Sequence, residues 1–330
     1  MTSSAFDGYF ADPFVLHLPG GGYVAYGTSD PTSSATGIGR VFTALVSTNL
    51  RDWTSVGPVL NRVGKELGDE YWAPEVVLSD GVFWMYYSVG QGITGHHIRV
   101  ARSDSSIGPF RDLGLNLTPL ERFAIDPHPF LDIDGKWYLF FARDVVDSQR
   151  PGTHLAVAPL VSMTHLDSTL PALEPNADWQ MYERSRRMYG RTFDWHTLEG
   201  PTVVRRHGHY WMTYSGGAWT GPGYAVSWAS AEHPLGPWNH AIEGTPPLLR
   251  TGEGLSGPGH NSIVADGNGN EVIAFHAWDE KGRRTMRLRF ISFEPEGPRV
   301  DGPIWGPSAP PSESSTYSDL GRVRAGETAG

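Results

Sequence analysis

Short runs of aromatic and β-branched residues, each placed just after a glycine, dominate the pattern of this 330-residue chain. The five runs are Tyr23–Tyr26, Phe83–Tyr87, Trp137–Phe141, Tyr210–Tyr214 and Val272–Phe275. Runs of this length, bounded by turn residues, are typical of strands, and the 40 Gly and 26 Pro leave little room for long helices. The pattern therefore predicts an all-β protein.

A second regularity lies upstream of the same turns. Nine residues before each turn glycine stand, in chain order, Asp12, Trp72, Asp126, Glu199 and His260. A proline follows four of these residues within two positions. Five unequal repeats of about 50 to 70 residues predict a five-bladed β-propeller. The innermost strands of such a ring begin at one end of its central channel, so the five residues are expected to face one another across a pocket.

The repeats predict one catalytic domain over residues 1–306 and a Pro- and Ser-rich tail over residues 307–330. The stretch 162–193 is the least strand-like part of the interior. It is expected to supply the outer strand of the third blade and a long crossing loop that shapes the binding site. About ten residues precede the first inner strand, too few for a strand shared with the last blade. Ring closure is therefore expected to rest on side-chain packing.

Composition narrows the class of partner. A net charge of −10 argues against nucleic acid and anionic membranes, because both require a basic face. No apolar run approaches the roughly 20 residues of a membrane span. The first six residues lack the features of a signal peptide. The chain as written is thus expected in the cytoplasm, or outside the cell if a leader has been removed, and we expect a monomer. The absence of cysteine excludes disulfides and thiolate metal sites.

Carboxylates that face an aromatic pocket suit glycoside hydrolysis, in which one acid donates a proton while another activates water or attacks. Taken singly, an Asp before Pro more often caps a turn, and a Trp in such a fold more often packs between blades. The five equivalent positions differ in residue type, however, whereas packing residues at equivalent positions would resemble one another. The variation favours a functional site.

Four segments together carry a resemblance. Phe10–Phe14, Tyr71–Glu75, Ile125–Pro127 and Leu198–Pro201 resemble the four signatures of glycoside hydrolase family 43, across about Gly8 to Pro303. The resemblance implies a five-bladed propeller and an inverting mechanism on arabinose- or xylose-containing glycans. It also implies that Asp12 is the general base, Asp126 the residue that modulates the pKa of the acid and orients it, and Glu199 the general acid.

The segments Tyr214–Trp219 and Phe275–Trp278 resemble the arabinan-acting members of that family. They favour an exo-acting α-L-arabinofuranosidase or arabinanase that acts on arabino-oligosaccharides or arabinan. A β-xylosidase, a bifunctional xylosidase/arabinofuranosidase and a non-catalytic carbohydrate-binding propeller remain alternatives. The candidate substrate-binding residues are Trp72, Glu75, His128, Trp219, His276 and Arg287.

Residues 259–263 resemble the arabinanase branch, in which the matching histidine lies near calcium or another ion in the channel. His260 is therefore the candidate metal residue. Calcium prefers oxygen ligands, so water would have to supply most of them. No organic cofactor is expected.

Overall fold

The computed structural model describes residues 4–28 and 39–303, and these residues form strands almost throughout. Helical structure within these ranges is confined to two 3₁₀ turns, η1 (Lys65–Leu67) and η2 (Asp178–Gln180). None of their helices has the length and apolarity needed to cross a membrane. The all-β prediction is confirmed. The predicted tail, 307–330, lies outside the described residues.

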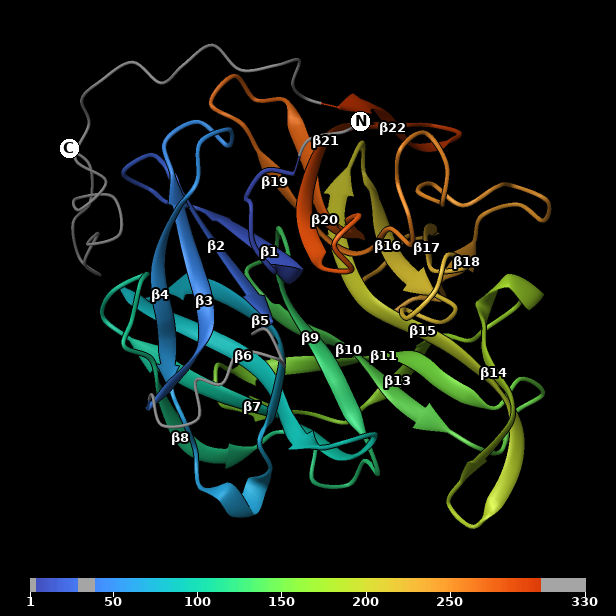
Figure 1. Cartoon of the computed structure of the whole chain (residues 1–330). Coiled ribbons are helices and arrows are strands. Elements are labelled where there is room, and N and C mark those ends of the chain that lie inside the picture. Colours follow the sequence, from blue (N-terminus) through green and yellow to red (C-terminus); the bar gives the residue numbers. More distant parts are fainter. Residues whose placement is uncertain (1–3, 29–38, 304–330) are drawn as a thin grey trace.

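The strands form five groups that follow one another along the chain (Figure 1). The first group is β1 (Ala11–His17), β2 (Tyr23–Thr28), β3 (Arg40–Ser47) and β4 (Thr54–Asn61). The second is β5 (Glu70–Ser79), β6 (Val82–Gln91), β7 (Thr94–Ser103) and β8 (Arg111–Asn116). The third is β9 (Ala124–Leu131), β10 (Trp137–Val145), β11 (Gly152–Ser162), β12 (His165–Leu166) and β13 (Leu170–Leu173). The fourth is β14 (Met181–Met188), β15 (Arg191–Arg206), β16 (His209–Gly216), β17 (Ala225–Ala231) and β18 (Asn239–His240). The fifth is β19 (Gly259–Ala265), β20 (Glu271–Trp278), β21 (Arg284–Glu294) and β22 (Gly297–Pro303).

Neighbouring strands within each group run antiparallel, and a short parallel pairing of β11 with β15 joins the third and fourth groups into one ten-stranded sheet. The stretch 162–193, predicted as an outer strand and a crossing loop, contains β12, β13 and η2 and then a long hairpin, β14–β15. β13 does pair with the third group, as the prediction of an outer strand required. The hairpin was not predicted.

Inner strands β1, β5, β9, β15 and β19 contact one another in cyclic order, with β19 returning to β1. A buried apolar cluster also lies between each pair of neighbouring groups, including the fifth and the first. In Figure 1 the sheets accordingly surround a common centre, where the inner strands come together. This arrangement brings residues far apart in the sequence into one site.

Closure between the last and first groups involves more than side chains. The outer strand of the fifth group is β22, which pairs with residues 289–294 of β21. Residues 4–10 form no strand, but the amides of Ala5 and Phe10 donate to the carbonyls of Met286 and Arg284. The expectation of closure by packing alone is therefore incomplete, because two backbone hydrogen bonds fasten the N-terminal segment to β21.

Candidate active site

Each inner strand is interrupted by a β-bulge, and the bulged residue has a positive φ. The five bulged residues are Asp12 (50°), Ala73 (47°), Asp126 (58°), Gly200 (56°) and His260 (44°). Bulges redirect side chains and are frequent beside active sites. Here three of the five carry polar side chains that turn toward the common centre.

The nine-residue spacing used as a guide in the sequence is wrong at two of the five positions. Trp72 and Glu199 each precede the bulged residue by one place, so their true equivalents are Ala11, Ile125 and Gly259. The reason is the length of the turn. Two-residue turns join β5 to β6 and β15 to β16, whereas five residues separate the paired ends of the other three hairpins.

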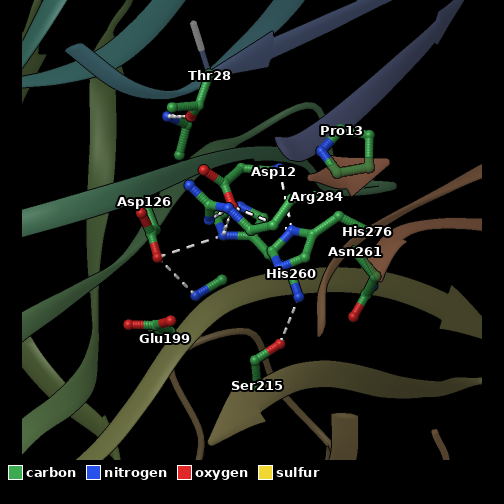
Figure 2. Close-up of polar contacts among 12 residues, drawn as sticks. Asp12, Pro13, Thr28, Asp126, Glu199, Ser215, His260, Asn261, His276 and Arg284 are labelled. Carbon is green, nitrogen blue, oxygen red and sulfur yellow. Dashed lines mark hydrogen bonds and ion pairs between the residues drawn. The ribbon is translucent and has the colours of Figure 1, made fainter. Parts of the chain in front are cut away.

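The polar bulge residues meet in one buried cluster (Figure 2). Nδ1 of His260 lies 3.6 Å from Oδ1 of Asp12 and 3.6 Å from Oδ2 of Asp126. The amide of Gly200 donates to Oδ2 of Asp126 at 3.0 Å. A Cβ at position 200 would stand 3.1 Å from the His260 ring, so this close approach, added to the positive φ, favours glycine there.

Asp12 is surrounded by positive or neutral nitrogen groups. Nη1 of Arg284 lies 3.2 Å from Oδ1 of Asp12, and Nδ1 of His276 accepts the Asp12 amide at 3.2 Å. Burial alone would raise the pKa of Asp12, but Arg284, with smaller contributions from His260 and His276, holds that pKa well below its ordinary value. Burial lowers the pKa of His276 to about 4, so this imidazole is neutral and Arg284 is the charged partner. Asp12 is thus an ionised carboxylate.

Glu199 has the opposite electrostatic character. Tyr224 donates its hydroxyl to Oε1 of Glu199 at 2.6 Å. Burial and the charge of Asp12 raise the pKa of Glu199 to about 7, although the Tyr224 hydrogen bond opposes the shift. Burial and the charges of Glu199 and Asp12 also raise the pKa of Asp126. A proton is therefore retained by the coupled pair Glu199 and Asp126 while Asp12 remains charged.

A cleft opens above this cluster, and its lining includes Glu199, Trp72 and Trp219. Trp72 stacks on His96, with ring centroids 3.7 Å apart and planes 16° apart. Trp219 stacks on Trp278, and the guanidinium of Arg284 lies 4.5 Å from the Trp219 centroid. The two indoles are therefore held rigidly, as a surface for the apolar face of a sugar requires.

Of the six predicted substrate-binding residues, only Trp72 and Trp219 line the cleft. His276 lies beneath Asp12, which it positions. Glu75 and His128 are both buried and pair with each other at 2.8 Å, and Nε2 of His128 accepts the Val203 amide. These two side chains support the inner strands.

Arg284 and Arg287 are an odd number of positions apart on β21, so their side chains leave opposite faces of the strand. Arg284 approaches Asp12, and Arg287 faces away from it. Arg284 is therefore the arginine beside the carboxylates, and a role of Arg287 in substrate binding stays a prediction. Sequence reasoning missed Tyr224 and two cleft residues of the β14–β15 hairpin, Tyr182 and Arg186. The run Arg283–Arg289 signals that arginine matters here, but the strand pairing decides which one reaches the centre.

The residues around His260 do not resemble a calcium site. Calcium takes six to eight oxygen ligands, whereas one nitrogen of His260 faces two carboxylates and the Arg284 cation belongs to the same cluster. Across residues 4–28 and 39–303, no group of three or more His, Asp or Glu side chains is placed to hold a metal ion.

Comparison with known proteins identifies the family of this site. The sequence profile of glycosyl hydrolases family 43 matches residues 4–297. The chain belongs to glycoside hydrolase family 43. This family-43 enzyme is 27% identical to a β-D-galactofuranosidase of Aspergillus niger, over 82% of the chain and 74% of that protein. It is 25% identical to an extracellular exo-α-(1→5)-L-arabinofuranosidase of Streptomyces avermitilis, over 64% of the chain but only 43% of that protein.

A thermostable family-43 glycoside hydrolase of known crystal structure is 30% identical and superposes with a TM-score of 0.77, covering 92% of this chain and 96% of that one. Other relatives include an endo-arabinanase and a xylosidase/arabinosidase. The enzyme is therefore a glycoside hydrolase, as predicted, and its relatives act on several kinds of glycan.

Proposed function

We propose that this glycoside hydrolase releases L-arabinofuranose from the ends of arabinan or arabino-oligosaccharides, with inversion at the anomeric carbon. The observation that carries the chemistry is the pair formed by an ionised Asp12 and a Glu199 whose pKa is raised to about 7. The choice of sugar is supported by the names of the relatives. Arabinofuranosidases and the galactofuranosidase share a five-membered sugar ring as substrate.

We also propose that the five strand groups are the blades of a five-bladed β-propeller. The cyclic contacts of the inner strands and the five inter-group clusters support this count. A crystal structure with a sixth group, or with a gap between β1 and β19, would contradict it.

In the proposed reaction, Asp12 takes a proton from a water molecule as the water oxygen bonds to the anomeric carbon. The glycosidic bond breaks on the other side of the sugar, and its oxygen leaves with the proton of Glu199. Asp126 orients this region by accepting the Gly200 amide, and it shares a proton with Glu199, because burial and the charges of Glu199 and Asp12 raise the pKa of Asp126. Inversion needs room for the water, hence carboxyls about 6.5–9.5 Å apart, whereas retention requires about 5–5.5 Å.

A β-xylosidase or bifunctional activity is the second candidate, favoured by the xylosidase/arabinosidase relative. A non-catalytic carbohydrate-binding propeller is disfavoured, because binding alone does not require one ionised and one protonated carboxyl group in the same site. Such opposed pairs are the mark of acid and base roles.

The deciding experiment combines a panel of substrates with a stereochemical readout. We expect hydrolysis of 4-nitrophenyl α-L-arabinofuranoside over the matching β-D-xylopyranoside and β-D-galactofuranoside, and release of arabinose alone from linear arabinan. Proton NMR of the first product should show the inverted anomer. Preference for the xyloside would reject the proposed sugar, and a retained anomer would make Asp12 a nucleophile.

An ion near His260 remains a prediction of the family resemblance, and no step above depends on it. Metal analysis of the purified protein, with activity before and after chelation, tests it directly. Stoichiometric calcium would establish the site despite the unfavourable ligand set.

A further inference from the structure

The β14–β15 hairpin forms one wall of the cleft above Glu199. Tyr182, Arg186, Met188 and Trp195 of the hairpin line the cleft together with Glu199 and Trp219. Asp12 and Asp126 lie deeper, in the buried cluster between the inner strands. If Glu199 is the acid, the leaving group must pass the hairpin on its way from the reacting bond to solvent. The hairpin wall is therefore part of the subsite that binds the leaving group.

Arg186 is the unusual member of this wall. Its side chain is only 11% exposed, and its Cζ lies 4.5 Å from the ring centroid of Tyr182 and 5.5 Å from that of Trp195. Its nearest carboxylate is that of Glu183, 3.6 Å from Nε and itself 55% exposed. Among the described residues, no hydrogen-bond acceptor contacts the terminal nitrogens of Arg186. Burying a cation beside so weak a partner lowers the stability of a protein, unless a bound ligand supplies the missing counter-charge.

Asp144 and Glu199 both interact electrostatically with Arg186, whose charge opposes the effect of burial on the pKa of each carboxyl group. Asp144 lines the same cleft, but Thr153 donates to its Oδ1 at 3.0 Å and Tyr189 donates to its Oδ2 at 2.6 Å. Burial raises the pKa of Asp144 to about 6. Two more cations lie nearby: Arg187 is exposed on the hairpin, and Arg122 stands 5.3 Å from the Tyr189 centroid. Arg186 is the cation of a cleft whose two lining carboxyl groups, Asp144 and Glu199, both have a raised pKa.

We propose that Arg186 binds a carboxylate in the leaving group, so that the subsite takes a uronic acid residue of the glycan from which the terminal sugar is released. This proposal rests on the acid role of Glu199 in the proposed function. The guanidinium fork matches a carboxylate through two parallel hydrogen bonds, which a neutral sugar hydroxyl cannot offer. Tyr182 and Trp195 restrict the position of the planar guanidinium and supply apolar area for the sugar ring.

The test compares two disaccharides that differ only at C6 of the leaving sugar, an arabinofuranosyl galacturonic acid and the matching arabinofuranosyl galactose. We expect the wild-type kcat/KM to be about tenfold or more higher for the acid, because a hydrogen bond to a charged group is worth roughly 1.5–3 kcal/mol. In Arg186→Met the ratio of acid to neutral substrate should fall to about one, and Arg186→Lys should give an intermediate ratio.

Arg184→Met is the matched control, because Arg184 belongs to the same hairpin but its side chain is 74% exposed and pairs with Asp194. It should keep the wild-type ratio. Equal kcat/KM for the two substrates in wild type, or an unchanged ratio in Arg186→Met, overturns the proposal. If the aryl glycosides show that the enzyme prefers another terminal sugar, that sugar replaces arabinose in both disaccharides. The choice of terminal sugar and the recognition of the carboxylate are then tested separately. Absence of turnover with every glycone overturns both proposals.

Discussion

At the scale of single residues, the site depends on keeping two carboxyl groups in opposite states of protonation within one buried cluster. Arg284 favours the charge on Asp12, and burial disfavours a charge on Glu199. Tyr224 adds a finer control. Its own pKa is raised well above the ordinary value, chiefly by burial, so the hydroxyl stays protonated and always donates to Oε1 of Glu199. The proton of Glu199 is consequently left on Oε2.

The pH profile of kcat/KM should be bell-shaped for this reason. Glu199 must be protonated to act, so activity should fall as the pH rises through about 7. Asp12 must be ionised, and its lowered pKa places the acidic limb below the ordinary range of an aspartate. Initial rates with an aryl arabinofuranoside between pH 3 and 11 provide the measurement. An alkaline limb near pH 10 would contradict the assignment of Glu199 as the acid.

Tyr224→Phe should move the alkaline limb to higher pH by about one unit, because the lost hydrogen bond had favoured ionised Glu199. Tyr214→Phe is the control: Tyr214 is as deeply buried, but its hydroxyl contacts His240 instead. Its profile should match the wild type. A limb that stays in place in Tyr224→Phe would show that this tyrosine serves packing alone.

The two carboxyl groups proposed as acid and base should also differ in their response to the leaving group. Glu199→Gln should slow disaccharide hydrolysis by about 10²- to 10⁴-fold and activated aryl glycosides far less, because only the former need protonation. Asp12→Asn should slow both alike, because water must be activated in each case. Parallel measurements of kcat/KM on the two substrate types distinguish these outcomes. Reversed behaviour would exchange the two roles.

At the scale of strands and turns, the bulge is the device that the sequence reveals least directly. The spacing to a turn glycine located the correct region of every inner strand, because the bulged residue lies five or six positions before the end of each inner strand. The spacing could not place the bulge to within one residue, because it also includes part of the turn. A two-residue turn and a five-residue connection cannot be distinguished when only their glycines are compared. Likewise, the sequence run around Arg284 and Arg287 contains both candidates, and only pairing with β20 fixes which faces Asp12.

Gly200→Ala tests the bulge itself. Positive φ strains any residue with a Cβ, and here that atom would also press on the His260 ring beside the amide that holds Asp126. We expect a loss of about 1–2 kcal/mol in unfolding free energy and a large fall in kcat. Gly208→Ala, at a turn where φ is 88° and no atom lies near the added Cβ, should lose similar stability but keep its kcat. Equal kcat in both variants would show that the bulge does not position the site.

At the scale of the whole molecule, the interface between the first and fifth groups completes the ring. Phe10 is fully buried in its apolar cluster, whereas Phe6, 6.3 Å away between ring centroids, is only partly buried. Phe10→Ala should lower the free energy of unfolding by about 3–5 kcal/mol, and Phe6→Ala by clearly less. Chemical denaturation followed by tryptophan fluorescence measures both. A Phe10→Ala variant with wild-type stability would mean that closure depends on the backbone hydrogen bonds instead.

The same interface also affects the order in which the site forms during synthesis and folding. Asp12 takes its neighbours from 264 and 272 positions further along the chain, His276 and Arg284. Contacts between such distant residues form late, because a long loop must close before they can be made. During synthesis Asp12, the proposed general base, is therefore made well before both partners. It acquires the low pKa needed for that role only after β21 has been made and has joined β1.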